Sequence, residues 1–229
     1  MFPQGCVTFV TSLRRPTEIS SFPDRTLSRM PSVRRGLGIL GGTFDPPHIG
    51  HLAAAVEVRS ALQLERVLLM VANDPWQKTG RRPLSAAQDR LAMATASVAG
   101  MEGIEASDLE IARGGPTYSI DTLHVLKETA PDQQLFLIVG SDAAANLQTW
   151  HRHHELPELA TLVIVERSGE QAATPPDGWT TVRVSMPRLD VSSSDVRERV
   201  RTGRPLTPFV LPAVIGEIEA RGLYGLTDS

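Results

Sequence analysis

Near-continuous apolar runs alternate with helical segments along most of this chain, and that pattern restricts its fold more than any other feature. Strands are predicted at Leu37–Leu40, Arg66–Val71, Ile104–Ile111, Gln134–Val139, Thr161–Val165 and Val182–Val184. Helices are predicted at Gly50–Leu62, from a Ser85–Gln88 capping box to Ser97, at Ser119–Thr129 and after Asp142. Strands that are apolar on both faces indicate a parallel sheet covered on both sides. The predicted fold class is α/β, a doubly wound, Rossmann-like parallel sheet with helices on both faces.

The first 34 residues differ in composition from the rest of the chain. Residues 1–34 carry five arginines, many Ser, Thr and Pro residues, and no sustained periodicity. Three interpretations compete: a disordered tail, a transit-like segment, or an upstream mis-called start with Met30 as the true one. We favour a disordered extension or a mis-called start. The remaining residues, 35–229, are predicted to form a single domain, since 41% of the chain is hydrophobic and can supply one sizeable core.

The bulk composition argues against several classes of protein. A formal net charge of -3 provides no global positive field for nucleic acid or an anionic membrane. One cysteine, Cys6, rules out an internal disulfide and suits a reducing compartment. No apolar run approaches the roughly 18 residues of a membrane span. We expect a soluble cytoplasmic protein that has neither nucleic acid nor a membrane as a partner. The composition is also compatible with an oligomer.

The segment Gly41–Leu52, GGTFDPPHIGHL, indicates a phosphate site. It follows an apolar strand, turns at two glycines, and opens a helix with histidines at positions i and i+3. The free N–H groups and positive dipole end of a helix N-terminus favour bound phosphate. The spacing places His48 and His51 on one face, where both can reach the same phosphate chain. Two surface histidines beside a turn would explain neither the glycines nor Thr43.

Further polar segments follow other predicted strands. Ligands in such sheets bind outside the carboxyl ends of the strands, where Asn73–Lys78 and Gly140–Asp142 are expected to lie. The segment Val191–Arg197, VSSSDVR, places serines at a helix N-cap and an arginine in the first turn. Alone it is typical of an ordinary capped helix. Together with the Gly41–Leu52 segment it indicates the far wall of one triphosphate site.

From about Gly38 to Tyr224, the chain resembles the bacterial nicotinate-nucleotide adenylyltransferases. GGTFDPPHIGHL matches the opening phosphate motif of that nucleotidyltransferase superfamily, and VSSSDVR is similar to its second motif, with Ser194 where Thr is common. Gly115–Leu123 resembles the element whose backbone amides hold the nicotinate carboxylate. Gly140–Asp142 followed by Trp150 resembles the stretch whose tryptophan stacks on the pyridine ring. Pro75–Lys78 looks like the actinobacterial form of another family loop, and Gly222–Tyr224 matches the family ending.

The resemblance implies adenylyl transfer from ATP to nicotinate mononucleotide in NAD biosynthesis, giving nicotinate adenine dinucleotide and pyrophosphate. Catalytic roles are implied for His48, His51, Lys78 and Arg197. The implied ATP and phosphate site comprises Gly41, Gly42, Thr43, Phe44, His48, His51, Asp142, Ser193, Ser194 and Arg197. The implied mononucleotide site comprises Lys78, Thr117, Tyr118, Ser119 and Trp150. Mg²⁺ is expected to be held mainly by the ATP phosphates, with no dedicated protein metal site.

Several residues admit a structural as well as a functional interpretation. Asp45 is expected to stabilise a turn rather than bind metal, because Asp-Pro favours a turn. Asp142 could bond a ribose hydroxyl or cap the next helix, and Trp150 could be a core residue. His151, His153 and His154 are expected at a solvated helix start. Asp108, Glu110 and Arg113 are expected to form a charged strand end that shapes the substrate loop. Three arginines, Arg81, Arg82 and Arg90, are expected to be solvated and are assigned no role.

Two alternatives remain at this stage. The first is a related transferase that acts on phosphopantetheine or transfers a cytidylyl group to an alcohol phosphate, against which Gly115–Leu123 and Trp150 argue. The second is a nucleotide-binding regulatory module without catalysis. The intact set His48, His51, Lys78, Ser194 and Arg197 argues against it, because a sensor could lose any of them.

Overall fold

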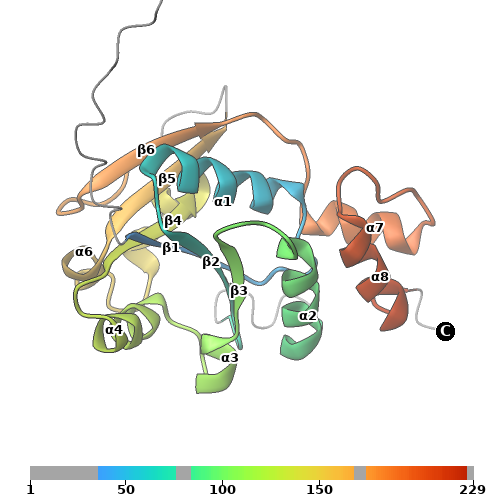
Figure 1. Cartoon of the computed structure of the whole chain (residues 1–229), viewed down its shortest axis with the longest axis horizontal. Coiled ribbons are helices and arrows are strands. Elements are labelled where there is room, and N and C mark those ends of the chain that lie inside the picture. Colours follow the sequence, from blue (N-terminus) through green and yellow to red (C-terminus); the bar gives the residue numbers. More distant parts are fainter. Residues whose placement is uncertain (1–35, 76–83, 168–173, 226–229) are drawn as a thin grey trace, which may run out of the picture. The chain divides into compact units, whose positions relative to one another are not determined.

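Six strands form one parallel sheet in the computed structural model, which describes residues 36–75, 84–167 and 174–225 (Figure 1). The strands are β1 (Gly36–Gly42), β2 (Arg66–Val71), β3 (Ile104–Ser107), β4 (Gln134–Gly140), β5 (Thr161–Arg167) and β6 (Thr181–Met186). Their order is β3-β2-β1-β4-β5-β6, with every neighbouring pair parallel. The chain runs outward from β1 to β3 and then returns to β4, beside β1. The predicted doubly wound fold is confirmed, and its switch point lies between β1 and β4.

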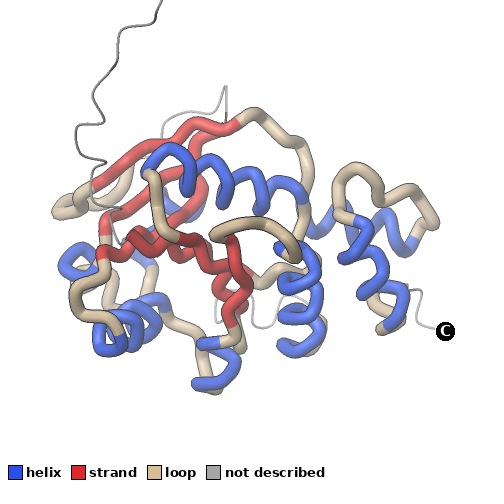
Figure 2. The backbone as a smooth tube through the Cα atoms, viewed as in Figure 1, coloured by secondary structure: helices blue, strands red, loops and turns tan. Residues whose placement is uncertain are grey.

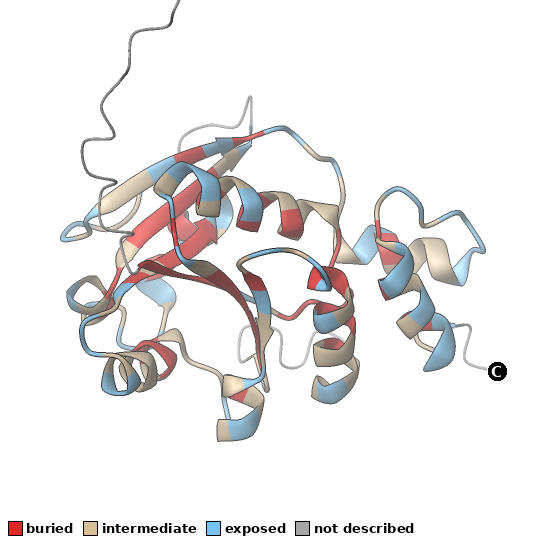
Figure 3. Cartoon of the chain, in the orientation of Figure 1, coloured by how far each residue is buried: buried red, intermediate tan, exposed pale blue. Residues whose placement is uncertain are grey.

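Helices cover both faces of the sheet, which is drawn in red in Figure 2. Along β2, Val67, Leu69 and Val71 pack in one core cluster with α1 (Ile49–Leu62) and α2 (Ala87–Val98). The alternate residues Leu68 and Met70 pack in a second cluster on the other face. That face is covered by α4 (Ser119–Thr129), α5 (Ser141–Ala145), the 3-10 turn η2 (Leu147–Thr149) and α6 (Leu156–Leu159). Burial of the four inner strands β2, β1, β4 and β5 on both sides (Figure 3) explains why their sequences lack polar alternation, whereas the edge strand β6 alternates.

The C-terminal helices α7 (Ser193–Arg201) and α8 (Pro212–Ala220) pack beside α2 (Figure 1). A third core cluster joins them: Met93, Val196, Val210, Val214 and Ile218. The serine cap predicted for α7 is confirmed, because the Ser192 hydroxyl accepts a bond from the backbone N–H of Asp195 at 3.1 Å. The sequence pattern did not predict α8, which is short and contains the poor helix former Gly216.

Two local predictions were wrong. The strand predicted over Ile104–Ile111 ends at Ser107, and Leu109–Arg113 form a short helix, α3, which ends at Gly114 with a positive φ of 71°. The predicted Ser85 capping box is absent: α2 begins at Ala87, and its N-cap Ala86 makes no side-chain bond. The Ser85 carbonyl instead accepts a bond from the Arg90 side chain. Among the described residues, no helix has both the length and the apolar character needed to cross a membrane.

Candidate active site

A cavity of about 360 Å³ opens at the carboxyl ends of β1 and β4, the switch point of the sheet. One wall, here the glycine-loop wall, consists of Gly41, Gly42, Thr43 and His51. The opposite tyrosine wall consists of Thr117, Tyr118, Ser119, Trp150 and His151. Apolar strand residues such as Ile39, Met70 and Leu137 also line the cavity. The structure thus brings the Gly41–Leu52 and Gly115–Leu123 segments to one cavity.

The two histidines of the first motif lie together at the start of α1. His48 is the N-cap, and its ring stacks on that of His51 with centroids 3.7 Å apart. The backbone N–H of His48 donates to Nδ1 of His51 at 3.2 Å. A neutral His51 therefore carries its proton on Nε2, as a donor on the other side of the ring. Burial, with a smaller contribution from the charge of Arg167, lowers the pKa of His48 to about 4, so this imidazole is neutral at pH 7.

The loop that joins β1 to α1 is fixed by side chains from distant parts of the chain. Arg197 donates from Nη1 to the Asp45 carbonyl at 2.6 Å, and Ser193 donates to the Pro46 carbonyl at 2.8 Å. The Tyr224 hydroxyl donates to Oδ1 of the fully buried Asp45 at 2.6 Å. Burial, and then the bond to Asp45, raise the pKa of Tyr224. Asp45 therefore stabilises the loop, as predicted.

Phe44 occupies the core beneath this loop. Its side chain is 1% exposed, and its ring contacts the edge of His51 with centroids 5.1 Å apart. The backbone at Phe44 has a φ of 49°. A Cβ at Gly42 would lie 2.9 Å from the Phe44 ring, so the second glycine of the motif is needed for this packing.

The tyrosine wall is pinned to the segment after β2. The Thr117 hydroxyl accepts bonds from the backbone N–H groups of Asn73 at 3.0 Å and Asp74 at 3.3 Å. Asn73 also donates from Nδ2 to the Gly115 carbonyl at 2.9 Å. Tyr118 is the N-cap of α4, so Ser119 begins a helix whose first N–H groups have no partner within the helix. Such a terminus suits a carboxylate or phosphate.

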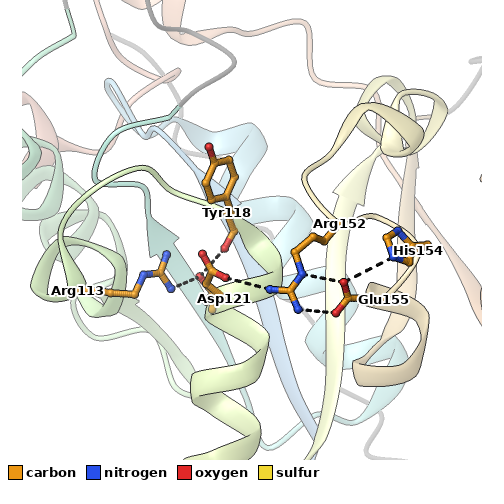
Figure 4. Close-up of polar contacts among 7 residues, drawn as sticks. Arg113, Tyr118, Asp121, Arg152, His154 and Glu155 are labelled. Carbon is orange, nitrogen blue, oxygen red and sulfur yellow. Dashed lines mark hydrogen bonds and ion pairs between the residues drawn. The ribbon is translucent and has the colours of Figure 1, made fainter.

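Trp150 and His151 complete this wall from a turn after η2. Trp150 is half-buried, packs against the second core cluster and also lines the cavity, so its role in the core is confirmed and its stacking on a pyridine ring stays a prediction. The His151 ring lies 4.3 Å from that of Tyr118. Arg152 follows, with a backbone φ of 51°. Its guanidinium donates to the Glu155 carboxylate from Nε at 2.7 Å and from Nη2 at 2.5 Å. Its Nη1 lies 3.9 Å from Oδ1 of Asp121 on α4 (Figure 4). His154 is exposed, and among the described residues no group of three His, Cys, Asp or Glu side chains could hold a metal ion.

A buried carboxyl group also lines the cavity. Glu110, which the sequence pattern assigned to a charged strand end, belongs to helix α3, is 5% exposed and lines the cavity. The Thr122 hydroxyl donates to Glu110 at 2.6 Å and accepts a bond from Arg113 at 3.2 Å. Burial raises the pKa of Glu110, and the bond from Thr122 opposes that shift.

Arg90 corrects a prediction of the sequence analysis. It was expected to be solvated, yet it is 1% exposed, and its guanidinium donates to four backbone carbonyls. Burial lowers the pKa of Arg90, and the charge of Asp45 opposes that shift. A signal exists in the sequence: Arg90 shares a helical spacing of i, i+3, i+4 and i+7 with the buried residues Met93, Ala94 and Ser97.

Comparisons with known proteins agree with this geometry. The family model described as cytidylyltransferase-like matches residues 39–199. A Corynebacterium kroppenstedtii protein named "Probable nicotinate-nucleotide adenylyltransferase" is 42% identical, covering 82% of this chain and 90% of that protein. A Frankia casuarinae protein of the same name is 45% identical, covering 81% of this chain and 98% of its own length. The chain belongs to the nicotinate-nucleotide adenylyltransferase family.

Solved structures support the fold of this adenylyltransferase. The nicotinic acid mononucleotide adenylyltransferase of Plasmodium falciparum, complexed with NaAD, superimposes with a TM-score of 0.68 at 20% identity. The match covers 83% of this chain and 97% of the Plasmodium chain. The same protein complexed with APC gives a TM-score of 0.67. The predicted nucleotidyltransferase fold is therefore confirmed.

The predicted site residues of the adenylyltransferase fall into four groups. Eight line the cavity: Gly41, Gly42, Thr43, His51, Thr117, Tyr118, Ser119 and Trp150. Five adjoin the glycine-loop wall without lining this cavity: Phe44, His48, Ser193, Ser194 and Arg197. Asp142 lies exposed in the first turn of α5 rather than capping it. Lys78, Arg81 and Arg82, and the prediction for residues 1–34, lie outside the described residues.

Proposed function

We propose that the cavity is the site at which this enzyme transfers the adenylyl group of ATP to nicotinate mononucleotide. A phosphate oxygen of the mononucleotide attacks the α-phosphorus of ATP, the bond from that phosphorus to the β-phosphate oxygen breaks, and pyrophosphate leaves. The observation that carries the proposal is the meeting of two helix N-termini, those of α1 and α4, at one cavity. One terminus suits the triphosphate and the other suits the acceptor.

On the glycine-loop wall, positioning and charge stabilisation are the main requirements, because the attacking phosphate is already anionic. Thr43 and the amides of the glycine turn would bind phosphate, and His51 would donate from Nε2 to the developing charge. Arg197 donates from Nη2 to the Ser194 hydroxyl at 2.8 Å, so these two side chains would hold the β- and γ-phosphates as a pair. Lys78 would supply a mobile positive charge.

On the tyrosine wall, the N–H groups at the start of α4 would hold the nicotinate carboxylate. Trp150 would stack on the pyridine ring, because it lines the cavity from the neighbouring turn. Asp142 would bond a ribose hydroxyl from the first turn of α5.

Mg²⁺ is proposed to enter with ATP. Asp45 is the one acid within the Gly41–Leu52 segment, and its carboxylate is already bonded to Tyr224, so the phosphates themselves would provide most of the ligands. Bound there, the ion would neutralise charge on the leaving pyrophosphate. The cytoplasm is the proposed compartment, since ATP is the adenylyl donor and the chain has one cysteine.

Pyrophosphate release from ATP and Mg²⁺ tests the function when three acceptor conditions are compared: nicotinate mononucleotide, phosphopantetheine and no acceptor. Release that depends on nicotinate mononucleotide supports the proposal. Release that depends on phosphopantetheine would assign the chain to a different transferase. ATP binding without release under any condition would indicate a nucleotide-binding module.

A further inference from the structure

Among the residues that the structure describes, Arg90 is the largest fully buried side chain, and its hydrogen bonds go to backbone carbonyls. Nη1 donates to Thr43 at 3.0 Å and to Ala72 at 2.6 Å. Nη2 donates to Asn73 at 2.9 Å, and Nε donates to Ser85 at 3.0 Å. The planar fork of a guanidinium can serve several acceptors in one plane, whereas a lysine ammonium is a single compact donor group.

The carbonyls that Arg90 binds belong to different parts of the cavity. Thr43 follows β1 and belongs to the glycine-loop wall, whereas Ala72 and Asn73 follow β2. From Asn73 the bonds continue to the tyrosine wall, through its backbone N–H to the Thr117 hydroxyl and through Nδ2 to the Gly115 carbonyl. One buried side chain therefore connects both walls through a single intervening residue.

A buried cation is a costly way to stabilise a fold, because desolvation offsets much of the attraction that it gains. Burial indeed lowers the pKa of Arg90. An apolar residue of similar volume would fill the same buried space without that cost. What such a residue could not do is fix three chain segments at set distances from one another.

We propose that Arg90 is a positioning residue for adenylyl transfer, setting the spacing between the glycine-loop wall and the tyrosine wall. The proposal rests on the proposed function, in which the α-phosphorus of ATP lies against the first wall and the acceptor against the second. In-line attack is sensitive to that spacing, and a misplacement of ~1 Å can lower turnover about 10²-fold. Binding of each substrate depends on its own wall and is less affected.

The test compares Arg90→Lys, which keeps the charge, with Arg90→Met, which does not. Both variants should lower kcat about 10²-fold and change the KM of each substrate by less than about threefold. The control for lost stability is Val58→Ala, a fully buried change in α1 that should lower the melting temperature and leave kcat unchanged. Arg66→Lys makes the same substitution at the first residue of β2, the end of the strand away from the cavity, and is the control for replacing an arginine by a lysine. Parent-like kcat in Arg90→Lys, or a loss confined to KM, would overturn the proposal.

Two further measurements keep the proposal testable if the Arg90 variants do not fold, or if the parent enzyme shows no adenylyl transfer. Asn73→Ala leaves Arg90 in place, removes the bond to Gly115, and should lower kcat about tenfold, in line with one lost hydrogen bond. If the Arg90 variants are insoluble and Asn73→Ala keeps the kcat of the parent, Arg90 has a role in folding alone. Amide hydrogen exchange needs no substrate: Arg90→Lys should speed exchange at the backbone N–H groups of residues 42–45, 72–74, 115, 117 and 118, but not in β5. Unchanged exchange overturns the proposal, whereas a parent without transfer activity bears only on the proposed function.

Discussion

The two walls of the cavity differ in how they are held. On the glycine-loop wall, the loop after β1 is bonded by Arg90, Arg197 and Tyr224, and the groups at the centre of this network, Arg90 and Asp45, are almost completely buried. On the tyrosine wall, the turn that carries Trp150 is held by exposed contacts of Arg152, with Glu155 in the same turn and with Asp121 of α4 (Figure 4).

This difference bears on what each wall can do. Hydrogen bonds that are buried and shielded from water are expensive to break, so the glycine-loop wall can hold phosphates in a fixed geometry. Exposed ion pairs are weak and screened by salt, so the turn beside Trp150 can adjust when an acceptor binds. The comparison predicts that changes to the glycine-loop wall reduce turnover or stability, whereas changes to the tyrosine wall alter recognition of the acceptor.

The largest effect is expected from His51→Ala. This change removes a donor that the backbone of His48 orients toward the cavity, and it should lower turnover about 10²–10³-fold with the fold intact. Pyrophosphate release and circular dichroism measure the two quantities. His154→Ala, which removes an exposed imidazole, is the control and should keep parent turnover. Turnover within a few-fold of the parent in His51→Ala would remove this residue from the mechanism.

On the tyrosine wall, the next largest effect is the choice between acceptors. A carboxylate held by the N–H groups at the start of α4 gains charge-assisted bonds that a neutral amide cannot match. Nicotinate mononucleotide should therefore exceed nicotinamide mononucleotide in kcat/KM by about 10–10³-fold. Equal values for the two acceptors would place the carboxylate site elsewhere.

Trp150→Ala separates stacking from that carboxylate recognition. The indole would stack on either pyridine ring, so its loss should weaken both acceptors by roughly three- to tenfold and leave their ratio nearly unchanged. Steady-state kinetics with both mononucleotides measure the ratio. A ratio that collapses in this variant would show that Trp150 takes part in reading the carboxylate.

Removing the hydroxyl group from each of the two tyrosines of the chain should lower the stability by different amounts on the two walls. Tyr224→Phe removes the donor to a fully buried carboxylate, that of Asp45, at a cost of about 1–3 kcal/mol. The melting temperature should fall by roughly 3–10 °C in a domain of this size. Tyr118→Phe is the matched change on the tyrosine wall and should cause a smaller fall. Equal shifts in the two variants would contradict the comparison.

The pH dependence of stability should report the burial of His48. Its pKa is lowered to about 4, so between pH 6.5 and that value the unfolded chain binds a proton that the folded chain does not. The stability associated with the neutral ring is complete above pH 6.5 and declines as the pH falls, by at most ~3 kcal/mol. Urea unfolding of the parent and His48→Gln at pH 7 and 4.5 measures it. If the parent and His48→Gln lose the same free energy of unfolding between pH 7 and pH 4.5, the decline does not come from His48.

Much of this architecture could be predicted from local sequence. The apolar runs at Arg66–Val71 and Gln134–Val139 are long enough to identify buried strands, and alternation with helices then restricts the topology. The positions of His48 and His51 could also be predicted, because residues three apart at the start of a helix lie on the same face. Both predictions need information from only a few neighbouring residues.

The interactions that could not be predicted join residues far apart in the chain. Arg90 bonds a carbonyl 47 positions away, and the partners Tyr224 and Asp45 are separated by 179 positions. Backbone carbonyls carry no residue type, so no pattern marks Thr43 or Ala72 as acceptors for a guanidinium. Glu110 was misplaced for a different reason: a five-residue helix is too short to show a period distinct from that of a strand.

The smallest effect is expected from Arg152→Gln, and it tests whether the exposed contacts of the tyrosine wall matter at all. The change removes the contact to Glu155 within the turn after Trp150 and the contact from that turn to Asp121 of α4. We expect the KM for nicotinate mononucleotide to rise about two- to threefold with kcat unchanged, because exposed ion pairs contribute little. The difference from the parent should shrink at 0.5 M salt, where the Debye length is only about 4 Å. Arg201→Gln, which loses an exposed i, i+3 pair with Glu198 on α7, is the control and should leave the KM for the acceptor unchanged. A tenfold or larger fall in kcat for Arg152→Gln would mean that this wall, like the other, aligns the reacting groups, and the distinction between the two walls would fail.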